Sequence, residues 1–341
     1  MSRRITTLTT SLFLASMLLF TACGDEPGPP PSTAPATADP AEPVEVPKKD
    51  AKPVPRFDAD SAYSYVAAQV AFGSRVVNTP GHTATKQYLI GKLKQFGAEV
   101  EEQDFNATTY YGANLEATNI IGRYNPDLPN RILLGAHWDT RHIADSKLEA
   151  DSTAIVYGAD DGASGVGVLL ELARQLGLST PDIGVDIVFF DAEDLGSSGD
   201  AESWGLGSQH YGKTLTEPKP KYGILLDMVG EENATFAYEE YSRTNAMPII
   251  TKVWDIAHAL PYGKYFPRRN GGSVLDDHFF VMKYGGVPMI DIINHRQDTE
   301  TGFVRHWHTG NDNMDKISKA TLQAVGQTVT AVIYREAQGT I

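Results

Sequence analysis

The sequence has 341 residues, of which 29 are Lys or Arg and 43 are Asp or Glu, so the formal net charge at pH 7 is -14. This length fits one large α/β domain once non-globular segments are set aside, and the acidic balance argues against nucleic acid, which binds clustered Lys and Arg. The single cysteine excludes a disulfide framework and a thiolate zinc cluster, so a metal site would need His, Asp and Glu.

The first residues are typical of an export signal. Arg3 and Arg4 precede an apolar stretch over 12–20, which is too short to span a bilayer core of about 30 Å as a helix. Small residues directly before Cys23 resemble the bacterial lipoprotein signal, in which that cysteine is lipidated and becomes the first residue. We therefore predict a lipoprotein signal peptide at 1–22; the alternative is an ordinary cleaved signal with an incidental cysteine.

A proline-rich segment follows the signal. Residues 24–56 contain ten of the twenty prolines and no aromatic residue, so they cannot bury enough apolar surface to fold. We predict that residues 23–56 form a tether with a lipidated Cys23. The protein is then exported and lipid-anchored, facing the periplasm or the outer membrane, because Gly24 lacks the aspartate that marks inner-membrane retention in some bacteria.

Helices and strands alternate from residue 57 onward. Helical spacing predicts helices at 58–72, 82–97, 164–178, 244–259 and 316–337. Strands are predicted at 98–105 and 117–124, and four apolar runs of the buried-strand kind lie at 132–136, 185–190, 224–226 and 289–293. This alternation predicts one α/β domain over 57–341, with a mostly parallel mixed central sheet and helices on both faces.

The central apolar runs end abruptly in ionisable residues. The relevant positions are 137–139, 160–161, 191–194 and Asp227. In open α/β sheets, ligands bind outside the carboxyl ends of the strands, where these groups would collect. A single carboxylate there is most simply a helix cap, but several at one sheet edge repel each other unless a cation or shared protons compensate them.

Two of the nine histidines stand out by their context. His137 ends a buried strand, and His308 lies beside a tryptophan in a loop before the last helix. By contrast, His82, His210 and His258 are expected on helix surfaces.

Four motifs, taken in order, resemble a known family. They are Gly-Ala-His-Trp-Asp at 135–139, Gly-Ala-Asp-Asp-Gly-Ala-Ser-Gly at 158–165, the acidic run at 191–194 and Trp-His-Thr at 307–309. Together they resemble the zinc aminopeptidase superfamily and, within it, bacterial glutaminyl cyclases (glutaminyl-peptide cyclotransferases) related to the animal enzymes. The resemblance covers nearly all of residues 57–341 and implies the zinc aminopeptidase-like fold.

The resemblance also implies roles for individual residues. It implies that Asp161, Asp194 and His308 hold one zinc ion, which leaves the open fourth position of a catalytic site. It implies that Glu193 is the general acid and base, that Asp227 and Asp276 belong to its proton network, and that Trp307 packs against the substrate.

The implied substrates are peptides or proteins with an amino-terminal glutamine. Glu193 would take a proton from the terminal amine, which attacks the side-chain amide carbon; ammonia leaves and pyroglutamate remains. We expect Asp227 and Asp276 to raise the pKa of Glu193 by like-charge repulsion. We also expect a monomer.

The main alternative is a two-zinc aminopeptidase on the same fold, which removes amino-terminal residues. Its second metal would use residues like His137 and Asp227, with Asp161 as the bridge, and all three are present. A third class, a catalytically inactive binding module, would be expected to lose the ligands or the general base, and here both remain.

Several residues favour the cyclase over the aminopeptidase. Aminopeptidases usually show two glutamates where this chain has Glu-Asp at 193–194, and commonly serine where it has Asp276. Trp138 and Trp204 also resemble the cyclases.

Overall fold

The structure is a computed structural model that describes residues 52–341. The predicted signal peptide, Cys23 and most of the predicted tether lie outside the described residues. Among the residues described, none of the helices combines the length and the hydropathy that a membrane span requires.

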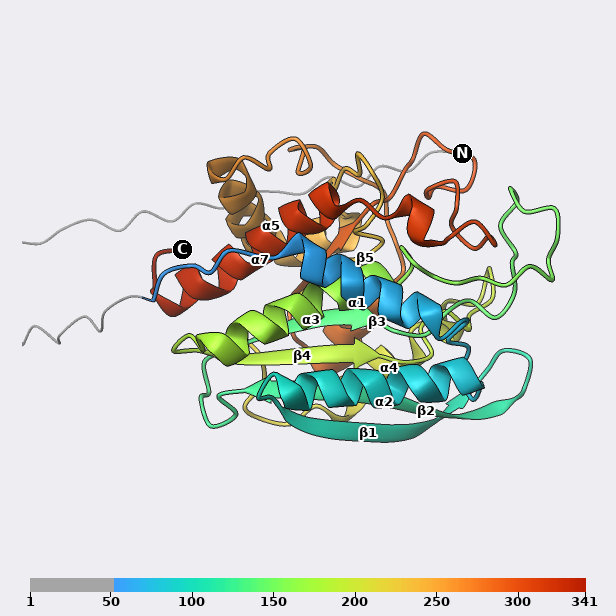
Figure 1. Cartoon of the computed structure of the whole chain (residues 1–341), viewed down its shortest axis with the longest axis horizontal. Helices are drawn as coiled ribbons and strands as arrows, with labels where there is room; N and C mark the ends of the chain where they lie inside the picture. Colours follow the sequence, from blue (N-terminus) through green and yellow to red (C-terminus); the bar gives the residue numbers. More distant parts are fainter. Residues whose placement is uncertain (1–51) are drawn as a thin grey trace, which may run out of the picture. The chain divides into compact units, whose positions relative to one another are not determined.

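The centre of the fold is a six-stranded sheet with the order β1-β2-β4-β3-β5-β6 (Figure 1). The strands are β1 (Glu99–Thr108), β2 (Asn114–Tyr124), β3 (Arg131–His137), β4 (Gly184–Phe190), β5 (Tyr222–Asp227) and β6 (Met289–Ile293). The hairpin β1–β2 is antiparallel and β2 is antiparallel to β4, whereas β4, β3, β5 and β6 run parallel. The prediction of a mostly parallel mixed sheet is confirmed.

Helices cover both faces of this sheet because successive strand residues point to opposite sides. Ile132 and Leu134 join the larger core, while Leu133 packs on the other face with Tyr211. The larger layer contains α1 (Ala59–Ala71), α2 (Pro80–Gln95), α3 (Ala163–Leu178), α5 (Glu240–Ala259) and α7 (Lys319–Ala337). The smaller layer contains α4 (Leu206–Thr214) and a π-helical turn at Val281–Gly285, which follows the short α6 (Asp277–Phe280).

The element bounds differ from the predicted ones mainly where local capping decides them. Helix α2 begins at Pro80 rather than 82, because the Thr79 side chain accepts a hydrogen bond from His82 N and proline suits the first helical position. The strands of the β1–β2 hairpin extend three residues further towards its tip than predicted. Helices α4 and α6 were not predicted, because each is too short for a helical period to be recognised.

A buried ion pair joins the beginnings of two central strands. Arg131 on β3 donates from Nε (2.9 Å) and Nη2 (2.6 Å) to the two carboxylate oxygens of Asp186 on β4. Its third nitrogen, Nη1, donates to the carbonyl oxygens of Asn125, Pro126 and Leu128. The pair therefore fixes both the strands and the loop that precedes β3.

The chain enters the domain through fixed contacts before α1. Phe57 is buried, and its N–H donates to Gln327 Oε1 at 2.9 Å. Gln327 Nε2 donates to Pro55 O at 3.0 Å, and Gln175 Nε2 donates to Arg56 O at 3.1 Å. Residues 55–57 are thus held against α3 and α7.

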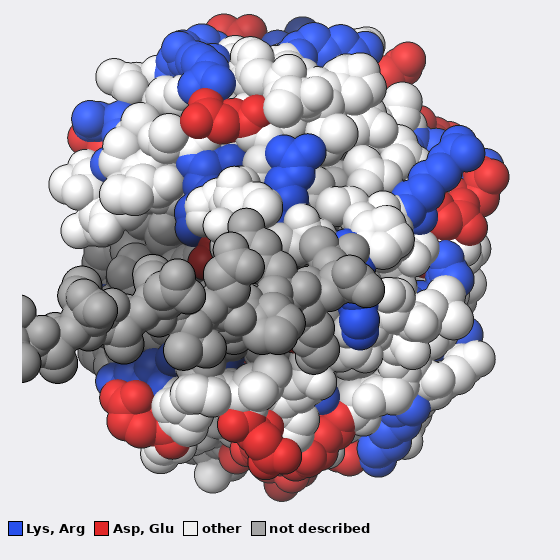
Figure 2. Space-filling model, turned by 90° about the vertical axis from the view of Figure 1, so that its left-hand side faces the viewer, with Lys and Arg blue, Asp and Glu red and all other residues white. Residues whose placement is uncertain are grey.

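Charged side chains of both signs are mixed on the face shown in Figure 2. Exposed pairs of this kind include Arg268 and Asp255, whose Nη2 and Oδ1 atoms lie 2.6 Å apart. A solvent-exposed pair contributes only about 0–1 kcal/mol to stability. The exclusion of nucleic acid as a partner stays a prediction from composition.

Helix α5 is anchored at its start by a buried carboxylate. Glu239 accepts hydrogen bonds from the backbone amides of Tyr241 (2.9 Å) and Ser242 (2.7 Å), and His278 Nε2 lies 3.0 Å from its Oε2. Burial alone would raise the pKa of Glu239, but these hydrogen bonds outweigh it and hold the pKa at about 2.

This anchor predicts an acid-dependent loss of stability. The folded pKa of Glu239 lies below its unfolded value of about 4.3, so its contribution is complete above that value and lost as pH falls towards about 2. We expect urea unfolding to show the wild type losing on the order of 3 kcal/mol relative to Glu239→Gln across that range. A difference between the two proteins that does not change with pH would contradict this role.

Candidate active site

The structure brings the three predicted metal ligands together at the carboxyl edge of the sheet. Asp161 lies just before α3, Asp194 lies in the turn after β4, and His308 lies in the loop between β6 and α7. One ligand atom from each lies within 4.8 Å of the others, and all three residues are buried. His308 Nε2 is 3.1 Å from Asp194 Oδ1 and 3.8 Å from Asp161 Oδ2.

The chemistry of this trio fits a divalent metal such as zinc. Two carboxylates and an imidazole are donors that zinc accepts. Both carboxylate oxygens of Asp194 are buried, and neither accepts a hydrogen bond from residues 52–341, although His308 Nε2 lies 3.1 Å from Oδ1. His308 Nδ1 is paired with Asp145 at 2.8 Å, which leaves Nε2 facing the two carboxylates. A cation would satisfy these groups.

Two buried aspartates hold the turns that carry the ligands. Asp139 accepts hydrogen bonds from the backbone amides of 193–194, at 3.1 Å each, and Asp312 accepts from the amides of 160–161, at 2.8 and 3.1 Å. Ala192 has a φ of 54°, a conformation that non-glycine residues adopt rarely. Hydrogen bonds to its backbone therefore fix the tight turn after β4, from Asp139 and from Asp191 within the turn, which accepts from Ala192 N at 2.9 Å.

His137 forms a second candidate metal cluster with Asp161 and Asp227. Its Nε2 is 2.9 Å from Asp161 Oδ1 and 3.2 Å from Asp227 Oδ1, and the three ligand atoms lie within 4.8 Å of one another. Gly162 permits this approach, because a Cβ there would lie 2.5 Å from His137 Nε2. Burial raises the pKa of Asp227 to about 8. The geometry thus offers a second group of three atoms that could bind a metal ion, with Asp161 shared between the two groups.

The predicted general base lies in the same pocket as the trio. Glu193, Asp227 and Asp276 line a pocket of about 460 Å³, and so do two members of the trio, Asp161 and His308. Burial raises the pKa of Glu193 well above its usual range, and the charges of Asp194, Asp276 and Asp277 raise it further, while His137 lowers it. The expected effect of Asp276 on the pKa of Glu193 is present, Asp227 is not among its main causes, and burial is the largest cause.

Beneath Asp276 lies an acidic cluster that sequence reasoning did not identify. Asp277, His278 and Asp291 are fully buried around it, and both oxygens of Asp291 lack a hydrogen-bond partner within the described chain. Burial raises the pKa of Asp277 and of Asp291 well above the usual range. Carboxyl groups placed so closely share protons rather than all being ionised. The available signal was an aspartate inside the otherwise apolar run 289–293.

Aromatic rings form one wall of the pocket. The Trp307 ring stacks on His308 with centroids 3.6 Å apart and on Phe303 with centroids 4.6 Å apart. Trp204 lies roughly parallel to His308, with centroids 6.4 Å apart. This wall offers an apolar surface beside the trio, and the packing of Trp307 against a substrate stays a prediction.

One histidine prediction is wrong. His82 is buried, its Nε2 lies 3.1 and 3.0 Å from the two oxygens of Asp191, and its ring stacks on Trp138 at 4.2 Å. The side of α2 that carries His82 faces the interior, so this histidine pairs with the buried carboxylate that follows β4. His258 is exposed as predicted, and His210 is half-buried.

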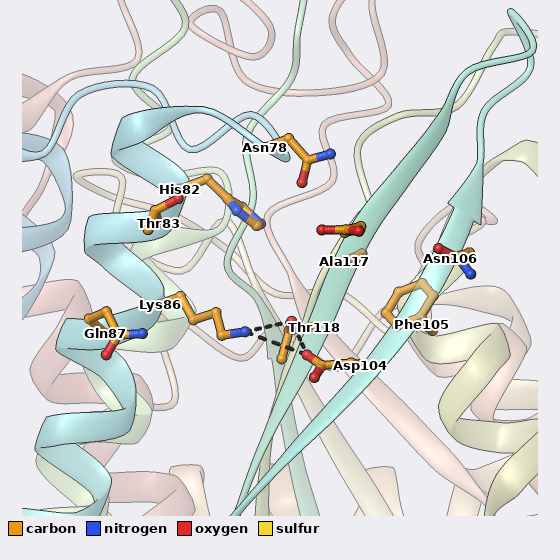
Figure 3. Close-up of a pocket in the computed structure, with 11 residues that line it drawn as sticks. Asn78, His82, Thr83, Lys86, Gln87, Asp104, Phe105, Asn106, Ala117 and Thr118 are labelled. Atoms are coloured by element: carbon orange, nitrogen blue, oxygen red, sulfur yellow. Dashed lines mark hydrogen bonds and ion pairs between the residues drawn. The ribbon is translucent and has the colours of Figure 1, made fainter.

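A second pocket of about 540 Å³ lies between α2 and the β1–β2 hairpin (Figure 3). Lys86 reaches into it and donates from Nζ to Thr118 Oγ1 at 2.9 Å, with Asp104 Oδ1 at 3.5 Å. None of the predicted catalytic or metal-binding residues lines this pocket. The charged groups at its centre, Lys86 and Asp104, pair with each other. The pocket of about 460 Å³ that Glu193 lines is therefore the candidate active site.

The fold and the metal trio define a class of protein. The sequence profile of peptidase family M28 matches residues 119–333, and the chain belongs to this family.

Similar proteins refine this assignment. A solved Zn-dependent exopeptidase from Parabacteroides distasonis is 50% identical, with a TM-score of 0.80, over 83% of this chain and 99% of that one. The Bacteroides thetaiotaomicron glutaminyl cyclase, solved with N-acetylhistamine, is 48% identical, also with a TM-score of 0.80 and the same coverage. The glutaminyl-peptide cyclotransferase of Bos taurus is 24% identical over 298 residues, covering 76% of this chain and 77% of that protein. The predicted resemblance to bacterial glutaminyl cyclases and the predicted fold class are confirmed.

Proposed function

We propose that this protein is a zinc-dependent glutaminyl-peptide cyclotransferase, which converts an amino-terminal glutamine to pyroglutamate and releases ammonia. The observation that carries this proposal is the position of Glu193. This buried acid lines one pocket with two of the zinc-ligand candidates, two further carboxyl groups and an aromatic wall. The similarity to solved bacterial glutaminyl cyclases supports the same activity.

Each pocket residue has a role in this reaction. Asp161, Asp194 and His308 would hold a zinc ion, which would supply Lewis acidity at the side-chain amide carbonyl. Glu193 accepts a proton from the terminal amine as the nitrogen bonds to the amide carbon. It then returns a proton to the amide nitrogen as the old carbon–nitrogen bond breaks and ammonia leaves. Asp276 receives and supplies protons beside Glu193.

The aromatic wall prepares the substrate for an intramolecular attack. Trp307 and Phe303 pack on the methylene groups of the glutamine side chain and exclude water from one side of the ring that forms. Since amine and amide belong to the same residue, most of the rate gain comes from holding them in contact. The substrates are peptides or proteins with an amino-terminal glutamine.

A two-zinc aminopeptidase is the second candidate, and one observation favours it. His137, Asp161 and Asp227 bring ligand atoms within 4.8 Å of one another, which would suit a second metal. The similar protein from Parabacteroides distasonis is also described as an exopeptidase. We propose a single zinc at the trio of Asp161, Asp194 and His308, with His137 and Asp227 hydrogen-bonded to each other.

Two peptides offered in parallel distinguish these candidates. We expect the purified protein to release ammonia from a glutaminyl peptide and to leave a leucyl peptide intact, with one zinc per chain. Mass spectrometry reads both reactions, and elemental analysis counts the metal. Removal of leucine together with two zinc ions would establish the aminopeptidase. If neither reaction occurred, the protein would instead be a binding protein.

We further propose that the protein is exported and held at a membrane through a lipidated Cys23. The basis is the sequence of residues 1–22 and the proline-rich composition of 23–56. The tether would let the catalytic domain of residues 57–341, acting as a monomer, reach glutaminyl peptides in the periplasm or beyond the outer membrane.

A further inference from the structure

A carboxylate outside the predicted site contacts one of the metal-ligand candidates. Asp145 lies in the long loop between β3 and α3, and its Oδ1 is 2.8 Å from His308 Nδ1. When Nδ1 donates its proton to Asp145, Nε2 carries the lone pair that faces Asp161 and Asp194. The hydrogen bond therefore selects the tautomer that can bind a metal.

Arg141 ties this carboxylate to a second ligand. Its Nη2 and Nε donate to the two oxygens of Asp145, at 2.6 and 3.2 Å. Its Nη1 donates to the carbonyl oxygens of Asp194 (2.9 Å) and Gly196 (2.8 Å). The guanidinium is buried and lies 4.9 Å from the centroid of the Trp204 ring. One side chain thus joins Asp145, the turn after β4 and the pocket wall.

Backbone contacts strengthen the same connection. Ser146 N donates to His308 O at 3.3 Å, and Gly310 N donates to Glu149 Oε2 at 3.1 Å. The loop that carries Arg141 and Asp145 therefore holds the His308 loop at several points while contacting the Asp194 turn.

We propose that Asp145 and Arg141 are positioning residues of the zinc site. Asp145 orients His308 and makes it a stronger ligand. Arg141 fixes the position of Asp145 relative to the turn that carries Asp194. This inference rests on the zinc of the proposed function. Partners of this kind typically change metal affinity by about 10–100-fold when removed.

The chain provides a matched control for the substitutions. Arg268 and Asp255 form an aspartate–arginine pair of similar length, 2.6 Å, on the surface, where the pair has no metal-ligand candidate as a partner. Asp255→Asn removes the same charge as Asp145→Asn without touching the site.

The test measures metal binding directly, by competition between the protein and a zinc chelator. We expect Asp145→Ala to weaken zinc binding by about 10–100-fold and Asp145→Asn to weaken it less, because the amide oxygen still accepts the Nδ1 proton. Asp255→Asn should match the wild type. With cobalt in place of zinc, the visible absorption bands of Asp145→Ala should shift, since they report ligand geometry.

Each outcome decides between the possibilities. Zinc affinity and cobalt bands of Asp145→Ala equal to those of the wild type would overturn the positioning role. A wild type that binds no zinc would instead contradict the proposed function. If Asp145→Ala fails to fold, Arg141→Lys provides the second test. Lysine keeps the positive charge but lacks the planar guanidinium group that bonds both Asp145 and the Asp194 turn. Unchanged zinc affinity of Arg141→Lys would therefore overturn the inference as well.

Discussion

Glu193→Gln is expected to lower kcat on glutaminyl peptides by about 10²–10⁴-fold while zinc stays bound. Glutamine has the size of glutamate but cannot accept the proton of the terminal amine at neutral pH. The next residue, Asp194, is the proposed metal ligand. Asp139 holds its turn through backbone amides, so the substitution should leave the trio in place.

The measurement combines steady-state kinetics with the zinc content of each protein. Glu202→Gln is the matched control, because that glutamate is exposed and pairs with Lys283 and Tyr284 outside the pocket. It should retain wild-type kcat. Loss of zinc from Glu193→Gln, or a kcat near that of the wild type, would contradict the assigned role of Glu193.

Arg131→Met is expected to lower the free energy of unfolding by about 3–5 kcal/mol. The methionine occupies part of the same space, but Asp186 is left as a buried carboxylate that is only 7% exposed. The three carbonyl oxygens that Arg131 Nη1 satisfies also lose their donor. Removing one partner of a buried pair costs more than the pair contributes, and the remaining carboxylate keeps only a longer contact, 3.9 Å, with the partly exposed Arg123.

The surface pair Arg268–Asp255 again provides the comparison. Arg268→Met should change the unfolding free energy by less than about 1 kcal/mol, because both side chains are roughly half exposed. Urea unfolding at one fixed zinc concentration measures both variants. If Arg131→Met lost no more than Arg268→Met, the buried pair would be dispensable and another interaction would have to align β3 with β4.

The fold was predictable where a long apolar pattern decides the structure. The runs at 132–136 and 185–190 are buried strands, and the helix at 164–178 lies within one residue of α3. Prediction failed where a few residues in a loop decide it. Helix α4 begins after Gly205, whose φ of 56° ends the preceding turn. The helix has only nine residues, which are too few for a helical period to distinguish it from a loop.

The candidate site was predictable to the extent that its residues end strands or belong to recognisable motifs. Asp161, Asp194 and His308 meet as predicted. Asp145 was not predicted, because an aspartate in a long loop has no distinguishing neighbours in the sequence and its contact with His308 spans 163 positions. His82 was wrongly placed at the surface for the same reason, since its partner Asp191 follows a strand that is distant in the sequence.

The ligand trio also bears on the order in which the chain is made. Asp161 and Asp194 lie near the middle of the sequence, whereas His308 lies in the last segment before α7. A nascent chain emerging from the ribosome therefore holds two carboxylates without their imidazole until nearly all of the domain has been synthesised. A chain that ends before residue 308 would lack the third candidate ligand and could not assemble the trio.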